Sequence, residues 1–187
     1  MKIQCTVTGI TPILMNRFTE QEEVAVSSGL RSSIKPHAET PRMMAMKKLY
    51  ADDKGNLFLP GTMIFATIVA AGVYHKLGRR QVTTQKTSLI PAGLCVTDLV
   101  CPLGTKHWEV DSRSVVNPKT GGRIMCHRPR LDEWATTFTM EVDTNMFGEK
   151  TVRLLVDDAG SKCGLGDYRP ARKGPFGRFV VQSWNVS

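Results

Sequence analysis

Residues 164–179 read GLGDYRPARKGPFGRF and lie between an expected helix and an expected last strand. Glycine tolerates positive φ and close backbone approach, but ordering a glycine-rich loop costs entropy that a bound ligand can offset. Tyr168, Phe176 and Phe179 offer faces for base stacking, and the cations of the stretch suit phosphates. These cations are Arg169, Arg172, Lys173 and Arg178. The stretch therefore favours a single-stranded nucleic acid as ligand, and the alternative is a solvated connection.

The hydrophobic pattern around this loop predicts regular structure. Residues 149–159 predict a helix with Gly160 as its C-terminal glycine, and residues 177–186 predict the closing strand. Residues 2–9 and 134–142 alternate between apolar and polar, which predicts half-buried strands. The buried faces are expected to carry Ile3, Cys5 and Val7 in the first strand, and Trp134, Thr136, Phe138, Met140 and Val142 in the second.

Two more helices and a hairpin are expected in between. Thr40 and Pro41 predict the start of a short helix, and Thr62 is a candidate cap for a longer helix that Gly78 ends. Residues 89–101 predict one or two strand segments broken near 91–93. The strand segments 108–116 and 123–127, on either side of a Gly/Pro turn, predict a β-hairpin.

The order of these elements is that of a β-α-β-β-α-β plan, which predicts an α+β, ferredoxin-like or RRM-like fold. We expect a single domain over residues 1–187, with three features added to the plan. They are an inserted lobe after the first strand (17–56), a basic β-hairpin (106–130) and the Gly-rich loop (160–179).

Charge narrows the possible partners. Lys and Arg outnumber Asp and Glu by 25 to 17, and a net charge of +8 favours anionic partners, nucleic acid before a membrane surface. No apolar run is long enough to cross a bilayer, and the first residues lack the apolar stretch of a secretion signal. The odd number of cysteines, five, without a Cys-x-x-Cys pair favours reduced thiols. We therefore expect a cytoplasmic location, in a bacterial cell or a phage-infected host, with no membrane partner, metal or cofactor.

A second basic segment lies in the expected hairpin, where residues 113–130 contain no acidic side chain. Such a hairpin can follow a phosphate backbone, although a solvated hairpin is an equally good interpretation of the charge run alone. The hairpin and the Gly-rich loop together supply the candidate nucleic-acid-binding residues: Arg113, Lys119, Arg123, Arg128, Arg130, Lys162, Tyr168, Arg169, Arg172, Lys173 and Arg178. A third basic cluster consists of Lys76, Arg79, Arg80 and Lys86.

The four histidines raise the question of catalysis. A neutral imidazole can deprotonate a ribose 2′-hydroxyl, so a metal-independent endoribonuclease that uses one of them is a rival hypothesis. They are His37, His75, His107 and His127, and none stands in a motif that requires this chemistry. We expect a protein that is not an enzyme.

Three motifs resemble the RAMP superfamily, the RRM-like proteins that include the RNA-binding backbone subunits of CRISPR effector complexes. They are GITPILM at 9–15, FLPGTMI at 58–64, and the Gly-rich loop with the strand that follows it. The C-terminal half is also similar to small stand-alone bacteriophage proteins of this type. The chain departs from the family pattern at Phe65-Ala66, where Lys-Gly is common, and in a longer Gly-rich loop that includes residues 167–170.

The resemblance implies a protein that binds single-stranded nucleic acid, RNA rather than single-stranded DNA, and that assembles along the strand as a filament-like homo-oligomer. CRISPR effector subunits are possible partners, and a phage protein that mimics a backbone subunit is the alternative. The inserted lobe is the expected assembly surface, through an acidic run (Glu20, Glu22, Glu23) and a methionine-rich helix (Met43, Met44, Met46). The sequence leaves open the type of nucleic acid, the sequence specificity and the oligomeric state.

Overall fold

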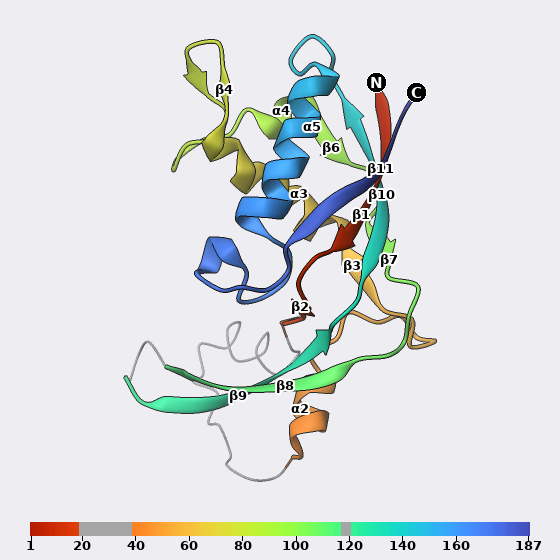
Figure 1. Cartoon of the computed structure of the whole chain (residues 1–187), viewed down its shortest axis with the longest axis vertical. Coiled ribbons are helices and arrows are strands. Elements are labelled where there is room, and N and C mark those ends of the chain that lie inside the picture. The colour runs from red at the N-terminus through yellow and green to blue at the C-terminus, as the bar shows by residue number, and fades with distance from the viewer. Residues whose placement is uncertain (19–38, 117–120) are drawn as a thin grey trace, which may run out of the picture.

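The computed structural model describes residues 1–18, 39–116 and 121–187. Its main sheet has four strands in the order β11-β1-β10-β6, and all neighbouring strands run antiparallel (Figure 1). The strands are β1 (Lys2–Gly9), β6 (Leu94–Val96), β10 (Ala135–Val142) and β11 (Phe179–Val186). Together with the helices described below, this sheet makes the protein an α+β fold, as predicted.

The alternating pattern places the two central strands. Ile3, Cys5 and Val7 of β1 are fully buried, and Cys5 lies opposite Phe138 of β10 and Trp184 of β11. On β10 the inward-facing residues are buried as well, together with the tryptophan that precedes the strand. The predicted buried faces of both strands are therefore confirmed.

Two helices, α3 (Gly61–Ala71) and α5 (Glu149–Asp158), cover one face of the main sheet (Figure 1). They bury their apolar side chains in the same core as the strands, including Ile64, Ile68, Val152 and Leu155. Burial of apolar surface of this kind is the main favourable term in folding.

The predicted limits of α3 are wrong at both ends. The helix begins at Gly61, directly after Pro60, so Thr62 lies inside it and does not cap it. It ends before Gly72, where a short 3₁₀ turn, η1 (Gly72–Tyr74), begins. Here the chain folds back on the end of the helix, so that Thr83 packs against Gly72. Its Oγ1 would lie 2.3 Å from a Cβ added to this glycine.

The chain after η1 forms a small hairpin. Its strands are β4 (Lys76–Leu77) and β5 (Arg80–Gln81). Gly78, predicted to end the helix, has a φ of +60° and lies in the turn between these strands.

The end of α5 also differs from the prediction. The helix passes into a π-helical turn, η2 (Ala159–Cys163), and Gly160 lies inside this turn. A Cβ on Gly160 would stand 2.2 Å from the carbonyl oxygen of Phe179, so glycine is needed there for close packing against β11. Gly164, with a φ of +73°, follows the turn.

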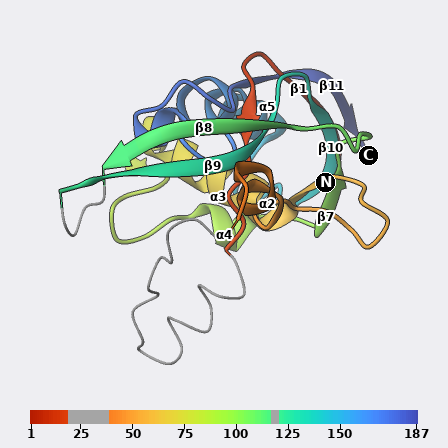
Figure 2. The same ribbon diagram turned by 90° about the horizontal axis from the view of Figure 1, so that it is seen from below.

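The second sheet has the order β2-β9-β8, with β2 (Ile13–Leu14), β8 (Glu109–Val116) and β9 (Arg123–Leu131). Strands β8 and β9 form a long hairpin that runs across the molecule beside α2 (Pro41–Met46) (Figure 2). The hydroxyl of Thr40 accepts a hydrogen bond from the amide of Met43 at 3.3 Å, which confirms the predicted N-cap. Residues 19–38, half of the predicted inserted lobe and including its acidic run, lie outside the described residues.

The remaining elements are short. Strand β3 (Phe58–Pro60) pairs with β7 (Val100–Pro102), and the Gly-rich loop contains a 3₁₀ turn, η3 (Pro170–Arg172). The predicted break near residues 91–93 is a helical turn, α4 (Ile90–Gly93), in which the buried Gly93 packs against Met146 and Phe147. None of the helices in the described ranges has both the length and the apolar character needed to cross a membrane.

Candidate nucleic-acid interface

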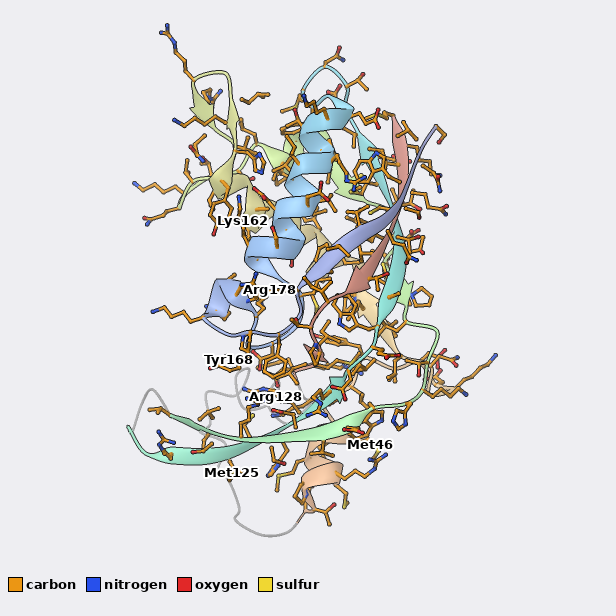
Figure 3. All side chains as sticks on the ribbon, in the orientation of Figure 1. Met46, Met125, Arg128, Lys162, Tyr168 and Arg178 are labelled. Atoms are coloured by element: carbon orange, nitrogen blue, oxygen red, sulfur yellow. The ribbon has the colours of Figure 1, made fainter. Side chains whose placement is uncertain are left out.

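A groove of about 860 Å³ lies between the β8–β9 hairpin and the Gly-rich loop. Both segments line it, with Arg113, Ser114, Val115, Val116, Arg128, Asp167, Tyr168, Arg169 and Arg172. Figure 3 shows Arg128 of the hairpin beside Tyr168 of the loop. Two basic segments that are distant in sequence therefore meet at one site.

Both walls of the groove are attached to one backbone segment, residues 11–15. On one edge this segment forms β2 and pairs with β9. On the other edge, the carbonyls of Pro12 and Leu14 accept hydrogen bonds from the amides of Gly177 and Asp167, both at 2.8 Å. The spacing of the two walls is therefore set by the width of a single extended segment.

Arg113 is held in place by a carboxylate and a ring. Its Nε donates to both carboxylate oxygens of Asp111, at 2.7 and 2.9 Å, and its guanidinium lies 4.7 Å from the centre of the Phe176 ring. Asp111 is only 5% exposed. The hydrogen bond to Asp111 raises the pKa of Arg113 above its ordinary value, so the guanidinium is a permanent cation at the groove.

Arg128 connects the hairpin to the loop. Its Nε lies 2.5 Å from Oδ2 of Asp167, and the two side chains are 12% and 27% exposed. The contact lacks the angles of a hydrogen bond, so its attraction is chiefly electrostatic. The other carboxylate oxygen of Asp167 accepts a hydrogen bond from the amide of Tyr168 at 2.9 Å. The groove lining thus combines four guanidinium groups with one carboxylate, which suits an anionic ligand.

Tyr168 is the exposed aromatic residue of the groove. It has a φ of +48°, which is rare for a bulky side chain and concentrates at functional sites, and it is 41% exposed. Its ring packs against Phe176 at 6.1 Å between centres. The prediction that Phe176 and Phe179 offer stacking faces is wrong, because both rings are buried, and Phe179 packs edge-on against Trp134.

The glycines of the loop serve its own close packing. A Cβ on Gly174 would stand 1.8 Å from the carbonyl oxygen of Tyr168, and one on Gly177 equally close to that of Leu165. Gly177 also has a φ of +71°. At these positions loop backbone, and not a ligand, takes the space that a side chain would need.

The other cations predicted at the site differ in their placement. Arg169 and Arg172 line the groove, and Arg169 also donates to a loop carbonyl at 2.8 Å. Arg172 is exposed and forms no ion pair within the described part of the chain. Lys173 ends η3 with a φ of +61°, and the exposed Arg123 begins β9. Lys119 lies outside the described residues.

Three predicted cations lie outside the groove and have protein partners. Arg130 pairs with two carboxylates at the base of the hairpin, at 3.0 and 2.9 Å. Lys162 pairs with Asp158 at 2.6 Å, and Arg178 donates to the carbonyl of Ser161 at 2.6 Å. Figure 3 shows Lys162 and Arg178 between the groove and the end of the molecule that carries β4.

The described histidines do not share a site. His37 lies outside the described residues, and the others are His75, His107 and His127. Nε2 of His75 lies 2.9 Å from Asp158, whereas Nδ1 of His127 shares a hydrogen bond of 2.8 Å with the hydroxyl of Ser112. Across residues 1–18, 39–116 and 121–187, no three or more His, Cys, Asp or Glu side chains are grouped closely enough to hold a metal ion.

Sequence reasoning missed four lining residues: Ser114, Val115, Val116 and Asp167. The strand pairing could have indicated part of this set. Asp111 lies opposite Arg128, and every second residue of β8 from Asp111 onward, including Val115, lies on the same face of the hairpin. In the sequence Asp167 stands in a loop insertion, and nothing there indicates its partner.

No protein-family model matches the sequence, and no curated protein is similar to it in sequence. Among solved structures, the chain is similar to one in "Cryo-EM structure of the Type III-B Cmr-beta bound to cognate target RNA", with a TM-score of 0.56 and 10% sequence identity. The similarity covers 98% of this chain and 59% of that chain, so this chain spans less than two thirds of its structural neighbour.

At 10% identity the similarity shows a shared fold. It supports the RAMP-like fold that the three sequence motifs imply.

Proposed function

We propose that the protein binds single-stranded nucleic acid, RNA in preference to DNA, in the groove between the β8–β9 hairpin and the Gly-rich loop. The observation that carries the proposal is the convergence of four arginines and an exposed tyrosine on one groove. The guanidinium groups would neutralise phosphates, and Tyr168 would stack on one unpaired base. The structural neighbour, described as bound to its cognate target RNA, supports RNA as the ligand.

The fold supports the same proposal. The strand order β11-β1-β10-β6, with α3 and α5 on one face, supports the ferredoxin-like or RRM-like plan that the sequence predicts. We assign the protein to RAMP-like proteins without catalytic activity, acting alone or beside CRISPR effector subunits. A phage-borne mimic of such a subunit would use the same groove.

The direct test is fluorescence anisotropy with labelled single-stranded RNA, single-stranded DNA and duplexes at several salt concentrations. Four phosphate contacts on a single strand predict a slope of about −3 in log K against log salt. Arg128→Gln with Arg172→Gln should weaken binding and flatten the slope by about 1.4.

A matched control separates the groove from the overall charge. Lys2→Gln with Lys150→Gln removes the same charge from exposed positions near the starts of β1 and α5, and both elements begin at the end of the molecule away from the β8–β9 hairpin (Figure 1). The control should bind nearly as the wild type does. Equal weakening by both double variants would show that only net charge matters, and the proposal would fail.

A further inference from the structure

A chain of contacts leads away from the groove along the surface. Asp167 at the groove belongs to the same loop as Arg178, which donates to the carbonyl of Ser161 in the π-helical turn. Two residues before Gly164, Lys162 of this turn reaches the η1 turn, where its Nζ lies 4.7 Å from the centre of the Tyr74 ring. The Gly-rich loop and these two contacts thus connect the groove with η1.

At the far end of this path, Tyr74 and Lys162 form a second pairing of an exposed ring with a cation. Tyr74 is 54% exposed, more than Tyr168 in the groove. Asp158 holds the Lys162 ammonium at 2.6 Å and also lies 2.9 Å from Nε2 of His75, so one carboxylate contacts both the lysine over the ring and the residue that follows Tyr74 in the chain. An exposed aromatic ring with an anchored cation beside it can supply both a stacking face for a base and a charge for a phosphate.

The charge beyond Tyr74 points to the same kind of ligand. Lys76, Arg79 and Arg80 follow on the β4–β5 hairpin, and all three are exposed. Within the described ranges none of them forms an ion pair, in contrast to Arg130 at the base of the large hairpin. Cations without protein partners remain available to neutralise phosphates.

We infer that Tyr74 and Lys162, together with the cations of the β4–β5 hairpin, form a second subsite that binds the nucleotides flanking those in the groove. The inference rests on the proposed function, because it extends the path of the same strand. A base stacks on Tyr74, Lys162 contacts its phosphate, and the strand continues towards Arg79 and Arg80. The footprint of one protein molecule is then longer than the groove alone accommodates.

The test compares a short oligouridylate of about 4 nucleotides with a long one of about 12, each labelled and titrated with wild-type protein. The long strand reaches both subsites, and the short strand fills only the groove. Tyr74→Leu should weaken binding of the long strand about tenfold and leave binding of the short strand unchanged. Tyr74→Phe keeps the ring and should bind both strands as the wild type does. Lys162→Met should also weaken binding of the long strand alone, and Lys2→Met is the control for the single charge that it removes.

The outcomes separate the two proposals. If neither strand binds, the proposed function fails and the second subsite with it. If both strands bind and Tyr74→Leu weakens neither, or weakens both equally, the groove stands and the second subsite is refuted. Because Tyr74 is more than half exposed, its replacement leaves the core intact, and an unchanged melting temperature confirms that a loss of affinity is local.

Discussion

The ion pair between Arg128 and Asp167 allows a sharp test, because its two members should affect binding in opposite directions. Arg128→Gln removes a cation that we propose contacts phosphate, whereas Asp167→Asn removes the carboxylate that would compete with phosphate for this cation. Both variants lose the same ion pair. We therefore expect similar losses of stability and opposite changes in affinity.

The magnitudes follow from the exposure of the pair. A pair whose members are 12% and 27% exposed lies between a buried pair and a surface pair, so breaking it costs about 1–2 kcal/mol. For a chain of this size, that loss lowers the melting temperature by about 2–8 °C. A unit charge about 6 Å from a phosphate contributes about 0.7 to 2.8 kcal/mol for effective dielectric constants between about 80 and 20. The partial exposure of Asp167 favours the lower end, a change in affinity of about three- to tenfold.

Anisotropy titrations of the two variants with one single-stranded RNA, alongside thermal melts, measure both effects. Asp167→Asn should bind about three- to tenfold more tightly than the wild type. Arg128→Gln should bind more weakly, with a salt slope flatter by about 0.7. If Asp167→Asn binds as weakly as Arg128→Gln, the pair acts by shaping the groove, and the electrostatic reasoning is wrong.

Three further outcomes are expected. Tyr168→Leu should weaken binding of single strands by about 5- to 30-fold and leave duplex binding unchanged, and an equal loss for both would exclude stacking. Gly177→Ala should lower the melting temperature by about 4–8 °C, because its φ is positive and its Cβ would collide with backbone. Gly55→Ala, with a positive φ but open space around it, is the matched control and should cost less than half of that. Burial raises the pKa of Cys5 to about 12, so iodoacetamide at about pH 8.5 should alkylate the exposed Cys95 and spare Cys5, and rapid labelling of Cys5 in folded protein would contradict this.

The central strands could be predicted because apolar and polar residues alternate along each of them, and this pattern depends only on neighbouring residues. In β1, Ile3, Cys5 and Val7 alternate with polar residues. This alternation is enough to predict a strand with one buried face. The N-cap at Thr40 is equally local, since its partner is three residues away. The ends of α3 and α5 were missed because they depend on distant residues. Thr83 packs on Gly72, and the carbonyl of Phe179 packs on Gly160.

The sequence allowed the basic residues of the candidate site to be named, but it did not show that they come together in one groove. The sequence identifies Arg113 and Arg128 as members of a basic run. The alternation of residues along the hairpin does not show that the hairpin faces the Gly-rich loop. That arrangement depends on Asp167, whose pairing with Arg128 is a tertiary contact without a sequence motif. Phe176 was mispredicted for the same reason. As an aromatic residue in a basic loop it has the features of a stacking residue, but its ring packs against Tyr168 and Arg113.

The shared attachment of both groove walls to residues 11–15 has a consequence for when the site can form. Thr11 and Arg178 are joined by a hydrogen bond that spans 167 positions of sequence. Contacts of such long range are slow to form, and they cannot form on a ribosome until the C-terminal partner has emerged. A nascent chain that already displays the basic hairpin therefore still lacks the opposite wall. Affinity for a single strand should then arise in one step, late in folding, and a chain interrupted before the Gly-rich loop should carry the charge without the groove.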